Sequence, residues 1–337
     1  MQQENREESL KNWLEHLPSG YGLQKETLRK ASADASFRSY YRIDGQDGKT
    51  FIVMDAPPPE DTRPFIKVDQ LMRFADLNVP VIYEKDEEQG FLLLSDLGSQ
   101  TYLDVLNGEN ANRLMDDATD ALVRWQKISC PGVLPEYDEA VLRRELELFP
   151  TWYVEKHLGL EISDGDRFTL NRMFDLIIHR NLAQAKVFVH RDFMPRNLMP
   201  EAVNNPGILD FQDALYGPIS YDIASLCRDA FISWEEPIVI DWTIRYWEKA
   251  RKAGLPVPSD FGRFWEDVEW MGLQRHLKVL GIFARINYRD GKPKYLADTP
   301  RFMNYVMATV HRYGELKPLE AYLENINGVV KKDGYTF

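Results

Sequence analysis

The pattern of apolar residues changes character near Gly98. Before this point, short runs of β-branched and aromatic residues are separated by turn sequences, which predicts strands. After it, apolar residues recur at helical spacing, as over 110–129. The sequence therefore predicts a bilobal α+β chain, and ligand sites favour the junction of two such parts. We expect a small β-rich N-lobe over 1–95, a hinge at 96–98 and a larger helical C-lobe over 99–337.

The N-terminal part carries two predicted pairs of strands. Residues 37–43 and 50–54 flank the turn sequence DGQDG, which predicts a hairpin. A helix is expected over about 63–77, followed by short strands at 79–84 and 90–96. Leu92–Leu94 is apolar on both faces, which is typical of a buried strand.

Composition and charge exclude several classes of protein. The 337-residue chain has a formal net charge of −12, which disfavours nucleic acid as a partner because phosphate backbones bind clustered Lys and Arg. The two cysteines form neither a CxxC motif nor a Cys/His cluster, so no disulfide framework or zinc site is indicated. The polar, acidic start is unlike a secretory signal, and no apolar run reaches the ~18 residues of a membrane helix. We expect a cytoplasmic protein.

Residues 187–210 interrupt the helical pattern and contain the polar residues that indicate an enzymatic reaction. We expect two short strands, a loop and a third strand ending at Asp210. The loop reads H-R-D-x-x-x-x-N, with Asp192 and Asn197 at its polar positions, and Asp210 follows thirteen residues after Asn197. Phosphoryl transfer needs a carboxylate that accepts the proton of the attacking hydroxyl, and oxygen ligands that hold Mg²⁺ on the phosphates. These three residues fit both needs.

Together these segments resemble the aminoglycoside phosphotransferase and choline kinase family, over about residues 30–315. The resemblance implies the protein-kinase-like fold and the use of ATP and Mg²⁺. It implies that Asp192 is the catalytic base, that Asn197 and Asp210 bind the metal, and that His190 supports the loop. Asp-Phe-Gln at 210–212 replaces the Asp-Phe-Gly of protein kinases, and the carboxylate is retained.

Longer phrases narrow the resemblance. Residues 33–43, 207–229 and 277–302 resemble the bacterial cell-wall-recycling sugar kinases. These phosphorylate the anomeric hydroxyl of the amino sugars N-acetylmuramic acid and N-acetylglucosamine, which implies a role in peptidoglycan recycling. Two alternatives stay open: a kinase of another hydroxylated acceptor, such as an aminoglycoside, choline or homoserine, and a pseudokinase-like binding module.

The nucleotide end is expected at Ser36, Arg38, Leu94 and Asp96. Ser36 and Arg38 belong to the turn 33–38, which resembles the phosphate-covering turn of the family. Leu94 and Asp96 lie at the expected lobe junction, where backbone groups bind the adenine edge in this fold. Protein kinases carry a phosphate-binding lysine on the third strand. No lysine occurs in 52–55, so either Arg38, Arg42 or Lys67 supplies the charge, or the phosphates are bound more weakly.

The binding site for the phosphate acceptor is expected in the helical C-lobe. A muramic sugar carries a carboxylate, so a nearby cation is expected. The candidates are Arg196, Asp213, Arg275 and Arg285. Each polar residue of 274–289 taken alone is more typical of a solvated helix face. Arg196 is the best placed of the cations, because it lies inside the catalytic loop.

Overall fold

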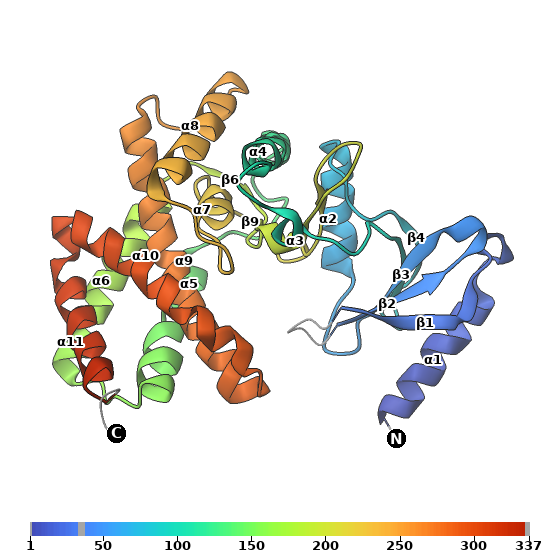
Figure 1. Ribbon diagram of the computed structural model, residues 1–337, viewed down its shortest axis with the longest axis horizontal. Coiled ribbons are helices and arrows are strands. Elements are labelled where there is room, and N and C mark those ends of the chain that lie inside the picture. The colour runs from blue at the N-terminus through green and yellow to red at the C-terminus, as the bar shows by residue number, and fades with distance from the viewer. Residues whose placement is uncertain (1, 33–37, 334–337) are drawn as a thin grey trace. The chain divides into compact units, whose positions relative to one another are not determined.

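The computed structural model describes residues 2–32 and 38–333 of the chain (Figure 1). Contacts divide the chain into two compact units, Met1–Leu106 with Arg196–Asp213, and Asn107–Pro195 with Ala214–Phe337. The chain thus returns to the first unit for the segment that begins at Arg196, which no change of composition indicated. The boundary at residue 95 and the hinge at 96–98 stay predictions.

An antiparallel five-stranded sheet, in the order β1-β2-β3-β5-β4, forms the main part of the first unit. Its strands are β1 (Gln24–Ser32), β2 (Ser39–Asp44), β3 (Thr50–Asp55), β4 (Ile82–Asp86) and β5 (Phe91–Ser95). The predicted hairpin is β2–β3, with Ile43 opposite Phe51. The predicted buried strand is β5, which lies between β3 and β4 and whose Leu92–Leu94 is at most 2% exposed.

The two faces of this sheet have different partners. Helix α1 (Gln2–His16), which the sequence interpretation did not anticipate, lies along one face and packs there through Leu10 and Leu14 (Figure 1). The sheet residues of this core cluster are Ile43, Phe51, Val53, Phe91 and Leu93. Because side chains alternate along a strand, Arg42, Ile52 and Leu94 belong to the opposite face. They are paired across β2, β3 and β5.

The first unit is completed by two helices and a small ribbon. Helix α2 (Arg63–Phe74) was predicted, whereas α3 (Tyr102–Val105) was not. Strands β7 (Leu198–Met199) and β8 (Gly207–Ile208) pair with each other, and Gly207 bridges to Asn78. The predicted third strand therefore ends at Ile208 rather than at Asp210. Asp210 follows it with a left-handed backbone, φ 62°, a conformation that Asp tolerates better than most residues.

The second unit is mainly helical. Its helices are α4 (Ala111–Lys127), α5 (Glu139–Leu146), a π-helical segment (Phe149–His157), α6 (Asp164–Leu182), α7 (Tyr221–Cys227), α8 (Glu236–Lys252), α9 (Phe261–Asp290), α10 (Thr299–Arg312) and α11 (Lys317–Asp333). Strands β6 (Lys186–Val189) and β9 (Leu215–Pro218) form an antiparallel pair. Residues 139–157 thus form α5 followed, after two residues, by the π-helical segment. Among the described residues, no helix is both long and apolar enough to cross a membrane.

Candidate active site

A pocket opens on the second face of the sheet, and all of its lining residues belong to the first unit. Its apolar wall includes Ile52, Phe65, Leu94, Leu97, Met199 and Leu209. Its charged and amide side chains are Arg42, Asp96, Arg196, Asn197 and Asp210. This mixture suits a ligand with a flat apolar portion and charged groups. Five predicted site residues from distant parts of the sequence line this pocket: Leu94, Asp96, Arg196, Asn197 and Asp210.

The first unit brings Asn197 and Asp210 together. Nδ2 of Asn197 lies 3.4 Å from Oδ2 of Asp210. The backbone fixes this approach, because the N–H of Leu209 donates to the carbonyl of Asn197 at 2.9 Å. Gln212 donates from Nε2 to Oδ1 of Asp210 at 2.8 Å. The Asn197 side chain and the Asp210 carboxylate offer the hard oxygen donors that Mg²⁺ prefers.

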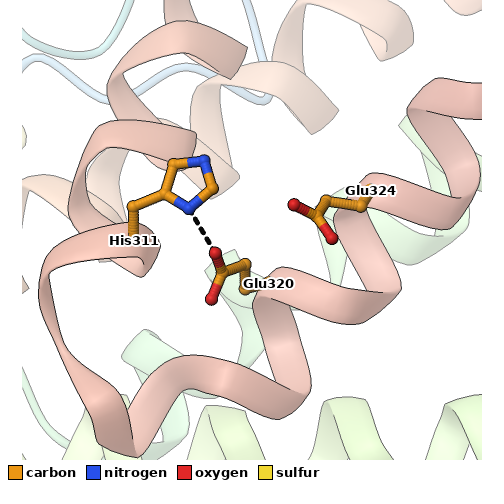
Figure 2. Close-up of side chains that lie close together, drawn as sticks. All are labelled: His311, Glu320 and Glu324. Carbon is orange, nitrogen blue, oxygen red and sulfur yellow. Dashed lines mark hydrogen bonds and ion pairs between the residues drawn. The ribbon is translucent and has the colours of Figure 1, made fainter.

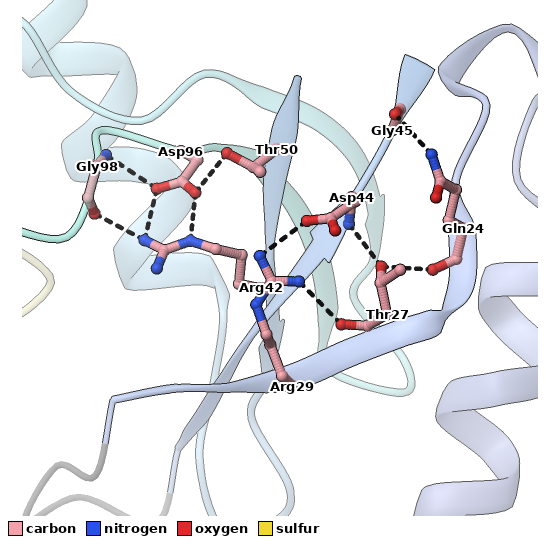
Figure 3. Close-up of polar contacts among 9 residues, drawn as sticks. All are labelled: Gln24, Thr27, Arg29, Arg42, Asp44, Gly45, Thr50, Asp96 and Gly98. Atoms are coloured by element: carbon pink, nitrogen blue, oxygen red, sulfur yellow. Dashed lines mark hydrogen bonds and ion pairs between the residues drawn. The ribbon is translucent and has the colours of Figure 1, made fainter. Parts of the chain in front are cut away.

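Arg42 is paired with Asp96 in the pocket, as Figure 3 shows. Its Nε and Nη2 donate to the two carboxylate oxygens at 2.5 and 2.9 Å, and Nη2 also donates to the carbonyl of Gly98 at 2.8 Å. Thr50 donates from Oγ1 to Asp96 at 2.7 Å. Burial alone would raise the pKa of Asp96, but the hydrogen bonds from Arg42 and Thr50 outweigh it and lower that pKa. The charge of Arg42 is therefore neutralised locally.

This pairing bears on the missing strand lysine. Of the three cations considered, Arg42 has a carboxylate partner in the pocket. Arg38 lies 2.9 Å from Glu60 and also donates to the carbonyl of Asp61 at 3.4 Å. Lys67 is exposed on α2. Ser36, with most of the predicted phosphate-covering turn, lies outside the described residues, and the role of each cation stays a prediction.

The loop that carries Asp192 follows β6 in the second unit. His190 is fully buried, and its Nδ1 accepts the backbone N–H of Asp192 at 3.2 Å. Asp222, on α7, accepts the backbone N–H groups of His190 and Arg191 at 2.7 and 3.0 Å. Burial raises the pKa of Asp222 to about 7, although those two N–H groups oppose the rise. Two side chains thus fix the backbone that presents Asp192.

The four acceptor candidates are divided between the two units. Arg196 lines the pocket of the first unit, and Asp213, also of that unit, is exposed. Arg275 and Arg285 lie on α9 in the second unit. Nη1 of Arg275 donates to the carbonyl of Arg228 at 3.4 Å. Burial lowers the pKa of the Arg285 guanidinium. These positions leave all four acceptor roles as predictions.

The prediction that the polar residues of α9 face solvent is wrong for most of the polar residues in 274–278. Gln274, Arg275, His276 and Lys278 are at most 6% exposed. Helix α9 packs against α6, α7, α8 and α10, so polar residues that look like a surface stripe in the sequence lie inside the unit. These charged groups must therefore find partners in the interior rather than in solvent.

A second group of potential ligand atoms lies on α10 and α11 (Figure 2). His311, Glu320 and Glu324 each bring one such atom within 4.8 Å of the others. Glu320 already accepts a hydrogen bond from Lys317 at 2.5 Å and contacts Nδ1 of His311. The hydrogen bond from Lys317 is the largest influence and lowers the pKa of Glu320, and the hydrogen bond with His311 lowers it further. These contacts of Glu320 with Lys317 and His311 account for the position of two members of the group, Glu320 and His311.

Two residues that the sequence patterns did not single out contact the loop that carries Asp192. Asp222 binds its backbone, and Glu145 on α5 binds the side chain of Arg191 at 2.5 Å. Asp222 carried a usable signal, because it is an acid within the otherwise apolar run of α7. Glu145 carried none, since an acidic residue on an amphipathic helix is ordinarily exposed.

The amino-acid sequence is similar to those of known phosphotransferases and sugar kinases. The sequence model of a phosphotransferase enzyme family matches residues 27–258. A protein of Pseudomonas aeruginosa named N-acetylmuramate/N-acetylglucosamine kinase is 52% identical over 97% of this chain and 98% of its own. A protein of Pseudomonas putida with the same name is 53% identical over 87% and 86%.

Solved structures are similar in fold. A choline kinase of Streptococcus pneumoniae is 13% identical, with a TM-score of 0.64 over 90% of this chain and 99% of its own. An ADP-bound aminoglycoside phosphotransferase is 14% identical, with a TM-score of 0.56 over 89% and 97%. At this level of identity the likeness concerns the fold, and it confirms the expected α+β, protein-kinase-like architecture.

Proposed function

Because this chain belongs to the phosphotransferase enzyme family, we propose that it transfers the γ-phosphoryl group of ATP to the anomeric hydroxyl of N-acetylmuramic acid and N-acetylglucosamine. The observation that carries the proposal is the 52% identity to a protein named as a kinase of these two sugars. The family match ends at residue 258, before α9, whereas the similarity to that protein extends over 97% of the chain. It therefore includes the helical region in which we expect acceptor specificity. We place the reaction in the cytoplasm, as a step of peptidoglycan recycling.

Asp192 is the proposed base. Its carboxylate accepts the proton of the sugar hydroxyl as that oxygen attacks the γ-phosphorus, while ADP leaves. A positioned base typically contributes about 10²- to 10⁴-fold to the rate. An anomeric hydroxyl is more acidic than other sugar hydroxyls, because the ring oxygen withdraws electrons. The contribution of Asp192 should therefore lie toward the lower end of that range.

Asn197 and Asp210 are the proposed Mg²⁺ ligands. Their oxygen donors fit this ion, and they lie in one pocket with the apolar wall that we assign to the adenine ring. When bound, Mg²⁺ supplies positive charge that neutralises the phosphates. We assign the backbone near Leu94 and Asp96 to the adenine edge, and the turn with Ser36 and Arg38 to the phosphate oxygens. Arg196, Asp213, Arg275 and Arg285 are the candidates for acceptor binding.

The second candidate is a kinase of another hydroxylated small molecule. The fold likeness to a choline kinase and an aminoglycoside phosphotransferase supports it. Choline and aminoglycosides are cations and favour acidic pockets, whereas the predicted acceptor residues are mostly arginines, which favours an anionic sugar.

The test is to incubate the protein with MgATP and each acceptor, and to locate the phosphate by phosphorus NMR. The matched control is the methyl glycoside of N-acetylglucosamine, whose anomeric oxygen is blocked. We expect an acid-labile anomeric phosphate from both free sugars and no product from the glycoside. Phosphorylation of the glycoside would place the phosphate on another hydroxyl. Turnover of choline or an aminoglycoside without turnover of either sugar would favour the second candidate.

A further inference from the structure

A buried group of charged and phenolic side chains surrounds Arg191 in the second unit. We call it the Glu145 network; its members are Tyr137, Glu145, Arg191, Tyr221 and Lys278. Oε1 of Glu145 accepts hydrogen bonds from Arg191 Nη2 at 2.5 Å and from Lys278 Nζ at 3.4 Å, and Tyr137 donates to Oε2. Lys278 also donates to the hydroxyl of Tyr221 at 2.8 Å. Glu145 and Lys278 are each 6% exposed.

The charged members of this network are ionised. Burial opposes the charge of Glu145, but Lys278 and Arg191 outweigh it and lower the pKa of the carboxyl. Burial likewise opposes the charges of Lys278 and Arg191, yet Glu145 raises the pKa of both. Asp192 also raises both of these pKa values, which puts its carboxylate within electrostatic reach of the network.

Stability alone does not account for such an arrangement. Buried ion pairs are commonly matched or exceeded in stability by well-packed apolar residues of similar volume, because desolvation offsets the attraction between the charges. Within the network two cations face one carboxylate, so the remaining positive charge interacts with Asp192, which lies outside the network. A role in holding a particular backbone geometry is a better explanation.

The backbone of Arg191 shows what is held. Its φ of 77° lies in the left-handed region, which a long side chain adopts only where its surroundings impose it. Its N–H is bound by Asp222, and its guanidinium is bound by Glu145, so Arg191 is fixed at both ends. Asp192 is the next residue, and the direction of its side chain depends on this turn.

We propose that Glu145 and Lys278 are positioning residues for phosphoryl transfer, which act through Arg191 to hold the turn that presents Asp192. We assign neither Lys278 nor Glu145 a contact with the substrates. The expected effect on kcat rests on the proposed function. The expected effect on the conformation of the loop does not. A misplacement of about 1 Å at a reacting group costs on the order of 100-fold in rate.

Lys278→Met is the primary variant, because Met keeps an unbranched chain of similar length and removes the charge. We expect kcat of the folded protein to fall at least about 10-fold, with the KM for ATP within about twofold, because the proposed ATP pocket lies in the other unit. Amide hydrogen exchange should become faster over residues 189–195. The Glu145→Gln/Lys278→Met double variant removes one charge of each sign. It should fold at least as stably as Glu145→Gln alone while kcat stays low, which separates positioning from stability.

The matched control is Glu269→Gln. Glu269 lies on the same helix and is 1% exposed, and it bonds Arg312 and Tyr313 rather than the loop. We expect wild-type kcat and wild-type exchange over 189–195 from its folded fraction. Wild-type values of both quantities in Lys278→Met and in the double variant, or an equal kcat loss in Glu269→Gln, would overturn the proposal. If wild-type protein phosphorylates neither sugar, the proposed function fails, and the exchange comparison still decides whether the network holds the loop.

Discussion

The side-chain amide nitrogen of Asn197 lies 3.4 Å from a carboxylate oxygen of Asp210, although thirteen residues separate them in the chain. The ribbon of β7 and β8 lies between the two residues in sequence, and its pairing folds the chain back on itself. A neutral oxygen donor and a carboxylate thereby reach one pocket.

This proximity leads to a prediction about metal-dependent binding. Asp210→Ala should weaken MgATP binding and turnover, because the phosphate charge loses a carboxylate-bound counter-ion. Asn197→Ala should do the same more mildly, because it removes a neutral ligand. Calorimetric titration with ATP, with and without Mg²⁺, measures both effects. Unchanged MgATP affinity in the two variants would remove these residues from the metal site.

Asp192→Asn should lower kcat by about 10²- to 10⁴-fold, toward the lower end of that range, and leave ATP affinity nearly unchanged. The amide keeps the shape of the side chain but cannot accept the proton of the acceptor hydroxyl. Steady-state kinetics and nucleotide titration test the two parts separately. A variant with full turnover would show that Asp192 is not the base.

Arg42→Met should destabilise the protein by on the order of 2 kcal/mol, less than the full cost of breaking a buried pair, because Arg42 is partly exposed. The loss arises because Asp96 keeps its charge without its cation. Chemical denaturation measures it, and Arg42→Met/Asp96→Asn should recover part of the loss. Unchanged stability with a large loss of ATP affinity would instead make Arg42 the phosphate-binding cation.

Gly281→Ala should destabilise the protein by at least about 1–3 kcal/mol, the usual cost of overpacking. A Cβ at Gly281 would lie 2.3–2.4 Å from backbone atoms of Leu148, which cannot move aside as a flexible side chain could. The matched control is Gly328→Ala on α11, where a Cβ meets nothing within 4 Å. That variant should gain up to about 1 kcal/mol from helix propensity. Equal unfolding free energies of the two variants would contradict the close approach at Gly281.

One thiol of the two should react with an aromatic disulfide reagent in the native protein. Cys130 is exposed, whereas burial raises the pKa of Cys227 to about 12 and keeps it protonated. Reaction proceeds through the thiolate. We expect a stoichiometry of about one thiol before denaturation and about two after it. Cys130→Ser should abolish the native reaction, and rapid reaction of both thiols would contradict the burial of Cys227.

Local patterns in the sequence determined most of the secondary structure. Runs of β-branched and aromatic residues around a turn specified β2 and β3, a continuous apolar run specified β5, and helical spacing specified α4, because these patterns follow from the geometry of each element. Helix α1 was missed although Leu10 and Leu14 are spaced for one helical face. Most other residues of this segment are polar or acidic, so its apolar face gave only a weak helical signal.

The sequence also showed the proposed site residues, since the spacing from His190 to Asn197 and the acid at Asp210 are local features. Only the tertiary structure decided which charges lie inside. Lys278 and Arg275 read as a solvated face of α9, and Glu145 carried no signal, yet all three are buried by the elements around them. Burial depends on neighbours that are distant in sequence, so helical period alone cannot show which polar residues of a helix face solvent and which lie in the interior.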